Sequence, residues 1–516
     1  MVVFSVKSVF MFLSLQVVKV QLLNILAVFP YEGRSHFLVF ESLLKELAGK
    51  GHNLTVISYF PQENAIPNYR DIALEGNIEE NKKWVKFTEP SYYKIIVVTI
   101  FLLVTGTNNC KVLLSDENVQ NLWKNETKFD VILVEQFNSD CALGLAHKLK
   151  APVVGISSHT LMPYHFSRLG VPNNPSFTPF QLLNGGTKPN IIQRIERTVF
   201  MIYFQYVVRV MIQTINQYTL SQYFHDLPSL EDLGRNIKLM LLNEHFTFLA
   251  PSILPSNVKE VGGLHVAENK PLPMDLEKFI NDSEHGVIYI SFGTMVGSSS
   301  IPPEKLQAIL RTIAKLQQRV IWKWDADTLP DKQNNIYMAK WLPQNDILAH
   351  PKVVAMFYHC GLLGLMEAMF YGVPVVGMPI FGDQPRNAAA LEESGLGVQI
   401  QVNKLSEDTL IKKFKIILDI KFREKVKMLS KRWRDRPIAP KEEAIYWIEY
   451  VARYPNATLN TAAADLSLYQ YLCLDVMLIF GILFASSFFL FKCVLNIYRN
   501  KHSKAKKFGS FKSKQQ

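Results

Sequence analysis

Cysteine is scarce in this sequence. Five cysteines occur among 516 residues, and none forms a C-x-x-C pair, so the spacing does not indicate a zinc site. Cys473 and Cys493 fall within or beside a long apolar run, which leaves Cys110, Cys141 and Cys360. Because these three are odd in number and widely spaced, we expect no disulfide framework and no metal centre.

Acidic residues are missing from the C-terminal tail. Residues 499–514 contain seven Lys and Arg, and without them the net charge falls from +11 to +4 (11 − 7), too little for a nucleic-acid surface. The preceding residues 476–491 carry no charge, and extension to Leu472 gives about 20 residues, enough to cross a bilayer. We therefore predict a juxtamembrane segment at 455–471, a transmembrane helix at 472–494 and a basic tail at 495–516.

The N-terminus has the pattern of a secretory signal. Residues 1–18 are apolar apart from Lys7 and small polar residues, and this run is too short for a span, so we predict a signal peptide at 1–20. The positive charge of the tail places it in the cytosol and the body of the chain in a lumen. Four N-glycosylation sequons are compatible with that location, although the first falls in an expected strand: Asn53, Asn125, Asn281 and Asn456.

The sequence between the signal peptide and the apolar span indicates two successive series of alternating strands and helices. An apolar run at 22–29, a loop, a helical pattern at 37–48 and a second apolar run at 53–58 indicate a βαβ unit with a parallel sheet. Prolines cluster between 251 and 273, as in a linker. The predicted organisation is a first Rossmann-like domain at 21–255, a linker at 256–284 and a second at 285–454. Further strands are expected at 131–134, 152–156, 287–292, 320–324, 354–358 and 373–378.

Two enzyme classes lack their signatures here. No G-x-G-x-x-G follows the first expected strand, which argues against a dehydrogenase. A glycosidase would need two facing carboxylates and would leave the polar motifs of the second half unexplained. The apolar stretches 95–104 and 199–224 are expected to be core helices, with an acceptor cleft or a membrane surface as the alternative.

A group of polar and aromatic residues lies close together in the second half of the sequence. His359 and Gly361 follow an expected strand and precede a helix, whose first amides form an anion site. Glu367, two turns along that helix, can accept hydrogen bonds from ribose hydroxyls. A flat aromatic face for a base is offered by Trp341, and donors and acceptors for sugar hydroxyls are offered by Asp383 and Gln384.

The order of these motifs resembles the signature of the UDP-glycosyltransferase family. The resemblance covers nearly the whole chain, and its signal peptide, span and basic tail resemble the animal, insect-like members. It implies two facing Rossmann-like domains (the B-type glycosyltransferase fold) and a C-terminal segment that returns over the first. The motifs that carry it are Trp341-Leu342-Pro343-Gln344, His359-Cys360-Gly361-Leu362-Leu363-Gly364, Gly382-Asp383-Gln384, Ser291-Phe292-Gly293-Thr294, Val261-Gly262-Gly263 and the run 436–450.

By this resemblance the donor site is implied residue by residue. Trp341 would stack on uracil, Gln344 would reach the nucleoside and Glu367 would bind the ribose. Two positions depart from the animal pattern: Cys360 replaces a glycine, although plant members share it, and Gly364 replaces a serine, which we expect to weaken donor binding. The remaining implied donor residues are Ser291, Thr294, Leu342, His359, Gly361, Asp383 and Gln384.

The resemblance places the catalytic base at His36, in the loop after the first strand. An acceptor hydroxyl needs a positioned base, and an imidazole titrates in the right range. Such a base works best with an acid on its other ring nitrogen. Glu135 occupies the family position at the end of a strand and is the predicted partner, with Asp140 as the alternative.

Together these features predict an inverting UDP-glycosyltransferase that acts on a small lipophilic acceptor such as a phenol. Glucose is the favoured sugar, UDP-glucuronate is the alternative donor, and a catalytically silent UDP-sugar-binding protein is the alternative class. No cofactor or nucleic acid is expected, and a homo-oligomer is compatible with the sequence. Lys512 and Lys514 resemble a dilysine retrieval signal, which predicts a type I protein of the endoplasmic-reticulum membrane.

Overall fold

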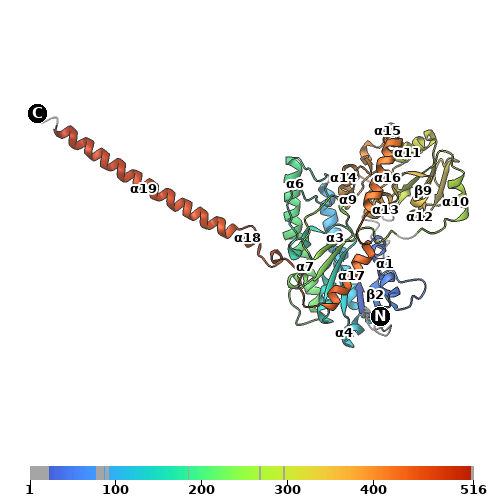
Figure 1. Cartoon of the computed structure of the whole chain (residues 1–516), viewed down its shortest axis with the longest axis horizontal. Coiled ribbons are helices and arrows are strands. Elements are labelled where there is room, and N and C mark those ends of the chain that lie inside the picture. The colour runs from blue at the N-terminus through green and yellow to red at the C-terminus, as the bar shows by residue number, and fades with distance from the viewer. Residues whose placement is uncertain are drawn as a thin grey trace, which may run out of the picture. The chain divides into compact units, whose positions relative to one another are not determined.

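The computed structural model describes residues 22–76, 87, 92–183, 185–266, 269–293 and 297–512. The expected signal peptide, Thr294 and Lys514 lie outside these residues. The chain divides into two compact units, Met1–Asn460 and Thr461–Gln516 (Figure 1).

The first sheet of the larger unit is parallel throughout. Its central strands pair in register, with Val28 beside Val134 and Val28 also beside Ile57. Because both faces of such a sheet are covered, its strands are continuous apolar runs, and β4 is buried along its whole length. In spatial order the strands are β3 (Tyr69–Ala73), β2 (Asn53–Ser58), β1 (Asn24–Val28), β4 (Val131–Glu135), β5 (Val153–Ser157), β6 (Leu239–Leu242) and β7 (Val258–Glu260).

The second sheet repeats this plan. All of its pairings are parallel, and the strand order again reverses beside its first strand, so that β8 lies between β9 and β11. The two facing α/β domains of the prediction are therefore confirmed. In spatial order the strands are β10 (Ile336–Ala339), β9 (Arg319–Lys323), β8 (Val287–Ser291), β11 (Val353–Tyr358), β12 (Val375–Gly377) and β13 (Gly397–Gln399).

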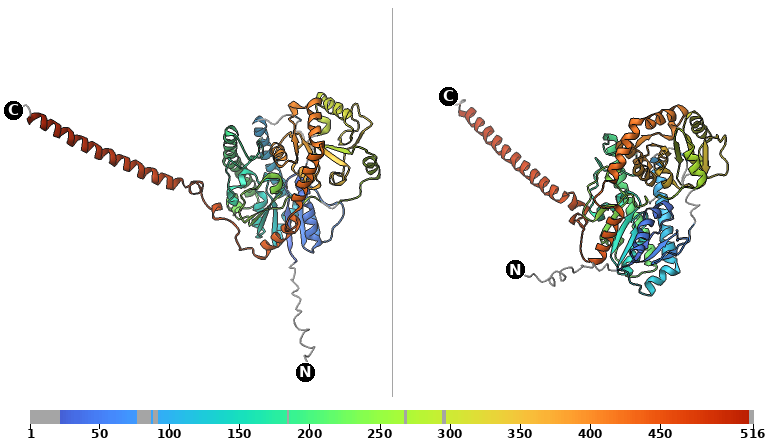
Figure 2. Two further views of the ribbon diagram at one scale, coloured as in Figure 1. Left: turned by 45° about the horizontal axis from the view of Figure 1, so that its top comes forward. Right: turned by 45° about the vertical axis from the view of Figure 1, so that its right-hand side comes forward.

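Helices pack around both sheets (Figure 2). In the first domain they are α1 (Arg34–Gly49), α3 (Tyr92–Ser115), α4 (Glu117–Lys124), α5 (Cys141–Lys148), α6 (Ile191–Ile202), the π-helical segment η4 (Tyr203–Val208), α7 (Arg209–Ser221), α8 (Leu230–Arg235) and α9 (Phe246–Leu249). In the second they are α10 (Met274–Asn281), α11 (Pro303–Lys315), α12 (Gln344–Ala349), α13 (Leu362–Tyr371), α14 (Gln384–Ser394), α15 (Glu407–Leu418) and α16 (Ile420–Arg434).

The helix α17 (Pro440–Arg453) returns to the first domain, as predicted. It packs beside α1 (Figure 1) and buries Ala444, Ile445, Ile448 and Val451 in the core of that domain. The linker begins later than expected. β7 lies inside the predicted linker 256–284 and completes the first sheet, because its backbone pairs in parallel with β6.

The smaller unit contains α18 (Leu468–Tyr471) and α19 (Leu474–Lys512). Within α19, residues Leu474–His502 are long and apolar enough to cross a membrane and bury nothing against the chain. The predicted span 472–494 overlaps this longer helix, which begins two residues later, at Leu474, and continues to Lys512.

The two apolar stretches that were expected to be core helices both contribute to the core. Residues 95–104 belong to the 24-residue helix α3, and residues 199–221 belong to the continuous run α6–η4–α7. Each also exposes one apolar face. Both Ile95–Ser115 and Ile191–Ser221 have the length and composition of a span, but each also packs against the body.

One disulfide is present, although the sequence predicted no disulfide framework. Cys110 of α3 is bonded to Cys141 at the start of α5, with their Cα atoms 5.5 Å apart. The two are 31 residues apart in sequence, but α3 crosses the β4–α5 loop and brings them together. Cys360 is buried and free. The four sequon asparagines, Asn53, Asn125, Asn281 and Asn456, are all exposed.

Loss of this disulfide should lower stability. Replacement of both Cys110 and Cys141 by Ala releases a loop of about 30 residues in the unfolded chain, and we expect a loss of about 2–4 kcal/mol in the free energy of unfolding. The measurement is the thermal midpoint of the solubilised full chain with and without dithiothreitol. Reduction should lower the midpoint of the wild type and leave the double variant unchanged; an unmoved wild type would contradict the prediction.

Candidate functional site

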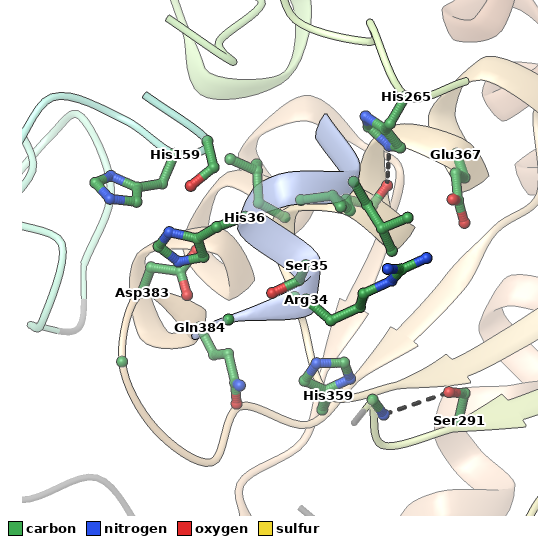
Figure 3. A pocket seen from close by; sticks show the side chains of 18 of the residues that line it. Arg34, Ser35, His36, His159, His265, Ser291, His359, Glu367, Asp383 and Gln384 are labelled. Atoms are coloured by element: carbon green, nitrogen blue, oxygen red, sulfur yellow. Dashed lines mark hydrogen bonds between the residues drawn. The ribbon is translucent and has the colours of Figure 1, made fainter. Parts of the chain in front are cut away.

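A cavity of about 1160 Å³ lies between the two domains. The carboxyl ends of the strands of both sheets face it, which is where open α/β sheets bind ligands. Figure 3 shows His36, His159 and Asp383 in one part of it and His359 and Ser291 in another. The site residues that line it are Ser291, Trp341, Leu342, Gln344, His359, Gly361, Glu367, Asp383, Gln384 and His36. Gly364 is not among the lining residues.

His36 lies in the first turn of α1, directly after the loop that follows β1. Its Nδ1 is 2.8 Å from Oε1 of Glu135, the last residue of β4, which is only 2% exposed. The contact forms because β1 and β4 are neighbours in the sheet, so their carboxyl ends meet. The rings of Tyr31 and Phe137 lie 4.6 Å from the His36 ring and hold its plane. The other nitrogen, Nε2, remains for a ligand.

Asp140, the alternative acid partner of His36, pairs with Arg168 instead. Its two oxygens accept hydrogen bonds from Nη1 and Nη2 of Arg168 at 2.9 and 2.7 Å. Both residues are almost fully buried, and the neighbouring carboxylate raises the pKa of Arg168 against the effect of its burial. Asp140 therefore neutralises a buried cation behind the cavity, and Glu135 is the acid that contacts His36.

The turn before α13 is where the sequence predicted an anion site. Gly361 caps the helix, so the first amides of α13 face the cavity. Cys360 has a left-handed backbone (φ 65°), a conformation that favours glycine. The His359 ring packs so tightly that a Cβ on Gly293 or Gly361 would lie 2.7 or 2.6 Å from it. Burial lowers the pKa of His359 to about 3, so the ring is neutral and acts as a hydrogen-bonding group.

A cation that the sequence interpretation missed supplies positive charge here. Lys323, at the carboxyl end of β9, lines the cavity and donates to the Gly293 carbonyl at 3.0 Å. Its charge contributes to the lowered pKa of His359, so the two are close. Its Nζ also lies 5.3 Å from the centre of the Trp341 ring. A lysine at the end of a predicted strand was the signal available in the sequence.

Tyr358 occupies the space that a side chain at position 364 would need. A Cβ on Gly364 would lie 2.4 Å from the Tyr358 ring and hydroxyl oxygen. The same hydroxyl lies 3.0 Å from the Cβ position of Gly361, so it sits over the first turn of α13. Tyr358 lines the cavity, and its hydroxyl lies beside the position that a side chain at residue 364 would occupy.

Another part of the cavity wall, formed by residues 341–344 and Glu367, combines apolar and polar side chains. Trp341 is 69% exposed and presents its face to the cavity, whereas Leu342 is mostly buried in the core beneath it. Gln344 Nε2 donates to Glu367 Oε2 at 2.5 Å. Burial raises the pKa of Glu367 to about 7, and this hydrogen bond opposes the rise.

Asp383 and Gln384 lie at the start of α14, facing the first domain. Asp383 accepts a hydrogen bond from Asn387 at 2.7 Å and is close enough to His36 for their charges to interact (Figure 3). Burial raises the pKa of Asp383, and that interaction opposes the rise. The Gln384 oxygen accepts from the amides of Ile380 and Phe381, which directs its amide nitrogen away from them.

Three other histidines have structural roles. His52, His245 and His350 each accept a hydrogen bond from a backbone amide. His159 instead lines the cavity, with its ring 5.5 Å from that of His36. Burial lowers the pKa of His159 to about 3, so it adds a neutral polar group beside His36.

An apolar wall closes the first-domain side of the cavity. It is built by the N-terminal half of α3, so the alternative reading of residues 95–104 as a cleft lining is confirmed. Phe137 and Met162 extend it toward His36. The α3 side chains in this wall are Ile95, Val97, Val98, Phe101 and Leu102.

Two facing parallel-sheet domains with a shared cavity define the glycosyltransferase B-type fold. The calicheamicin glycosyltransferase CalG4 has this fold, with a TM-score of 0.57 and 15% identity over 84% of this chain and 99% of its own. The glycosyltransferase of kitacinnamycin is similar, with a TM-score of 0.56, covering 83% and 98%.

The sequence comparisons identify the family. The model of the UDP-glucoronosyl and UDP-glucosyl transferases matches residues 24–508, and the chain belongs to this family of transferases. UDP-glucosyltransferase 2 of Dactylopius coccus is 35% identical, covering 91% of this chain and 92% of its own. UDP-glucuronosyltransferase 1A3 of Homo sapiens is 30% identical, covering 92% and 91%.

The two carboxylates near His36 should respond differently to neutralisation. Glu135→Gln should lower kcat by roughly 10²–10⁴-fold with UDP binding intact, because the imidazolium loses its partner. Asp140→Asn should instead lower the thermal midpoint, because it leaves buried Arg168 without its counter-ion at a cost of about 3–5 kcal/mol. Steady-state kinetics and thermal unfolding of both variants provide the measurements. A near-normal kcat for Glu135→Gln would refute the assignment.

Gly364 and Tyr358 should be energetically coupled. Gly364→Ser alone should destabilise the chain by about 1–3 kcal/mol, because its Cβ overlaps the Tyr358 ring. In a Tyr358→Ala background the same change should cost less, which gives a coupling energy of about 1 kcal/mol or more. The four thermal midpoints of this double-mutant cycle test it. Additive effects would show that the ring moves aside freely.

Proposed function

We propose that this chain transfers glucose from UDP-glucose to the hydroxyl of a small lipophilic acceptor, with inversion at the anomeric carbon. The observation that carries this proposal is the 2.8 Å contact between His36 and Glu135, in a cavity that also holds the donor-type residues of the second domain. The apolar wall of α3 supports a lipophilic acceptor.

The chemistry follows from the positions of these groups. Nε2 of His36 takes the proton of the acceptor hydroxyl as its oxygen bonds to the anomeric carbon, and the bond from that carbon to the diphosphate oxygen breaks on the opposite face. Glu135 holds Nδ1–H, which fixes the tautomer and stabilises the imidazolium. Bringing acceptor and donor together between two domains supplies much of the rate.

The second domain holds the departing UDP. We assign the diphosphate to the first amides of α13, His359, Lys323 and the Tyr358 hydroxyl, because dipole and cation both favour developing negative charge. Trp341 stacks on uracil, and Gln344 with Glu367 binds the ribose. We assign the sugar hydroxyls to Asp383 and Gln384. The carboxylate of Asp383 lies close enough to His36 for their charges to interact.

We also propose that the body is lumenal and anchored by α19. The disulfide supports an oxidising compartment, and the four exposed sequon asparagines are open to glycosylation. The apolar, unburied residues 474–502 support the anchor, and the basic residues after them favour a cytosolic C-terminus.

A microsomal transfer assay tests the function. Membranes from cells expressing the chain are given UDP-glucose or UDP-glucuronate with a panel of phenols and quinones, and glycosylated products are identified by mass. We expect glucosides with UDP-glucose, in keeping with the insect UDP-glucosyltransferase relative, and loss of product with His36→Ala.

Each other outcome has a distinct meaning. Preference for UDP-glucuronate would change the donor and keep the mechanism. UDP binding without transfer or donor hydrolysis would indicate a silent binding protein. Full activity of His36→Ala would refute the base mechanism.

The retrieval signal has its own test. Replacement of Lys512 and Lys514 by Ser should move the protein from the endoplasmic reticulum to later compartments, seen as glycans that become resistant to endoglycosidase H. The matched control replaces Lys504 and Lys506, which keep the same charge change outside the dilysine spacing. An unchanged distribution of the first variant would refute the signal.

A further inference from the structure

Two polar atoms beside His36 are buried and unpaired. Oγ of Ser158 and Nε2 of His159 have no hydrogen-bond partner within the part of the chain that the structure describes. Their residues are only 3% and 8% exposed, yet both line the cavity, and Figure 3 shows His159 beside His36. A buried polar group without a partner is costly, so two of them beside one reactive ring indicate that a ligand supplies the missing hydrogen bonds.

The first sheet brings these two atoms close to the reactive ring. β5 pairs in parallel with β4, with Ile156 beside Glu135, so the loop after β5 begins at the edge of the sheet where Glu135 meets His36. Ser158 and His159 are the first two residues of that loop. The ring centres of His159 and His36 are 5.5 Å apart. Two adjacent strand ends therefore place the acid–base pair and the two unpaired atoms in one part of the cavity.

The contacts of the His159 ring determine what its unpaired nitrogen can do. Nδ1 lies 2.5 Å from the carbonyl oxygen of Thr160, and because a carbonyl oxygen can only accept, Nδ1 carries the hydrogen. Burial lowers the pKa of His159 to about 3, so the ring is neutral and has no second hydrogen. Nε2 is therefore a hydrogen-bond acceptor, and its partner must be a donor.

Other side chains hold the loop that carries His159. Nε2 of Gln181 donates to the carbonyl oxygen of Thr160, the same oxygen that accepts from the His159 ring. Nδ2 of Asn243 donates to the carbonyl oxygen of Ser158 at 2.9 Å. The backbone on both sides of the ring is thus fixed by the protein, so the ring keeps its tautomer and a ligand in the cavity is left as the partner of Nε2.

We propose that His159 and Ser158 bind a second polar group of the acceptor, one that carries a hydrogen and is attached next to the reacting hydroxyl. This preference rests on the proposed transfer to an acceptor hydroxyl. The reacting hydroxyl donates to Nε2 of His36, and the neighbouring hydroxyl or amino group donates to Nε2 of His159. The short separation of the two imidazole rings places these donors on adjacent carbons. Oγ of Ser158 donates to the second group in turn.

Such a site discriminates through the penalty that it imposes on acceptors without the second donor. A monohydroxy acceptor leaves Nε2 of His159 and Oγ of Ser158 buried and unpaired, and a site built to bind a substrate hydroxyl rejects the analogue that lacks it. The preferred acceptors are therefore aromatic compounds with two hydrogen-bond donors on adjacent carbons. A methoxy group in place of the second hydroxyl should confer little of this preference, because its oxygen has no hydrogen to donate.

The test pairs one hydroxyl of the acceptor with one side chain. The acceptors are 2,3-dihydroxynaphthalene, 3-methoxy-2-naphthol and 2-naphthol. Their dissociation constants are measured by calorimetry with the solubilised full chain saturated with UDP, and kcat/KM is measured with UDP-glucose. The wild type should bind the dihydroxy compound about tenfold or more tightly than either of the others. In His159→Phe this ratio should fall to about one. His159→Gln, whose amide oxygen can accept in place of Nε2, should restore part of it.

The matched control is Met162→Leu, which alters an apolar side chain of the same cavity. This change should affect the three naphthols alike and leave the ratio of their dissociation constants unchanged. Thermal midpoints show whether each variant is folded. Should His159→Phe fold poorly, the preference of the wild type and the ratio in His159→Gln still decide.

Three outcomes would overturn the proposal. Equal affinity of the wild type for the dihydroxy and monohydroxy compounds would show that the unpaired atoms do not meet the acceptor. A ratio that His159→Phe leaves unchanged would give this histidine a structural role only. Absence of binding of all three naphthols would remove the acceptor class. Failure of the proposed function looks different, because the naphthols would bind in the expected ratio and give no glucoside with UDP-glucose.

Discussion

The adjacency of β1 and β4 in the first sheet is the constraint on which the site depends. Parallel pairing aligns Val28 with Val134, so the loop after one strand and the last residue of the other emerge at the same edge. His36 and Glu135 are 99 residues apart in sequence and meet only because of this register. A shift of one residue in β4 would turn Glu135 to the opposite face of the sheet.

The second domain uses the same geometry for a different purpose. β8 and β11 are its adjacent central strands, and the segments after them supply Gly293 and His359. In this domain the register packs the His359 ring tightly against Gly293 and Gly361. The first amides of α13 remain uncovered. One architecture therefore places the hydrogen-bonded pair of His36 and Glu135 in one domain and the uncovered first amides of α13 in the other.

Much of this arrangement could be predicted from the sequence, because it depends on local pattern. The strands with continuous apolar runs, the loop before His36 and the end of β4 at Glu135 all follow from patterns within a few residues. The strands β3, β6, β7, β10 and β13 were not predicted, since each has five residues or fewer and depends on its neighbours for pairing.

Contacts between segments that are distant in the sequence could not be predicted from it. The Cys110–Cys141 bond depends on where α3 crosses the β4–α5 loop, and no spacing rule encodes that crossing. The commitment of Asp140 to Arg168 is likewise invisible until α5 and the segment after β5 are packed together. The exchange between Gly364 and Tyr358 needs the shape of the first turn of α13, which only the structure gives.

The two halves of α3 are held by different contacts. Its C-terminal half is clamped to the β4–α5 loop by the disulfide, by the hydrogen bond from Asn138 to Thr105, and at Gly106, where a Cβ would lie 2.1 Å from the Asn138 carbonyl oxygen. The half that lines the cavity, from Ile95 to Leu102, lies beyond these attachments and packs against η4 and α7 instead. The cavity wall and the strand end that carries Glu135 therefore depend on different contacts of one helix. A change of side chain in the N-terminal half can reshape the wall without altering the contacts that hold the loop after Glu135.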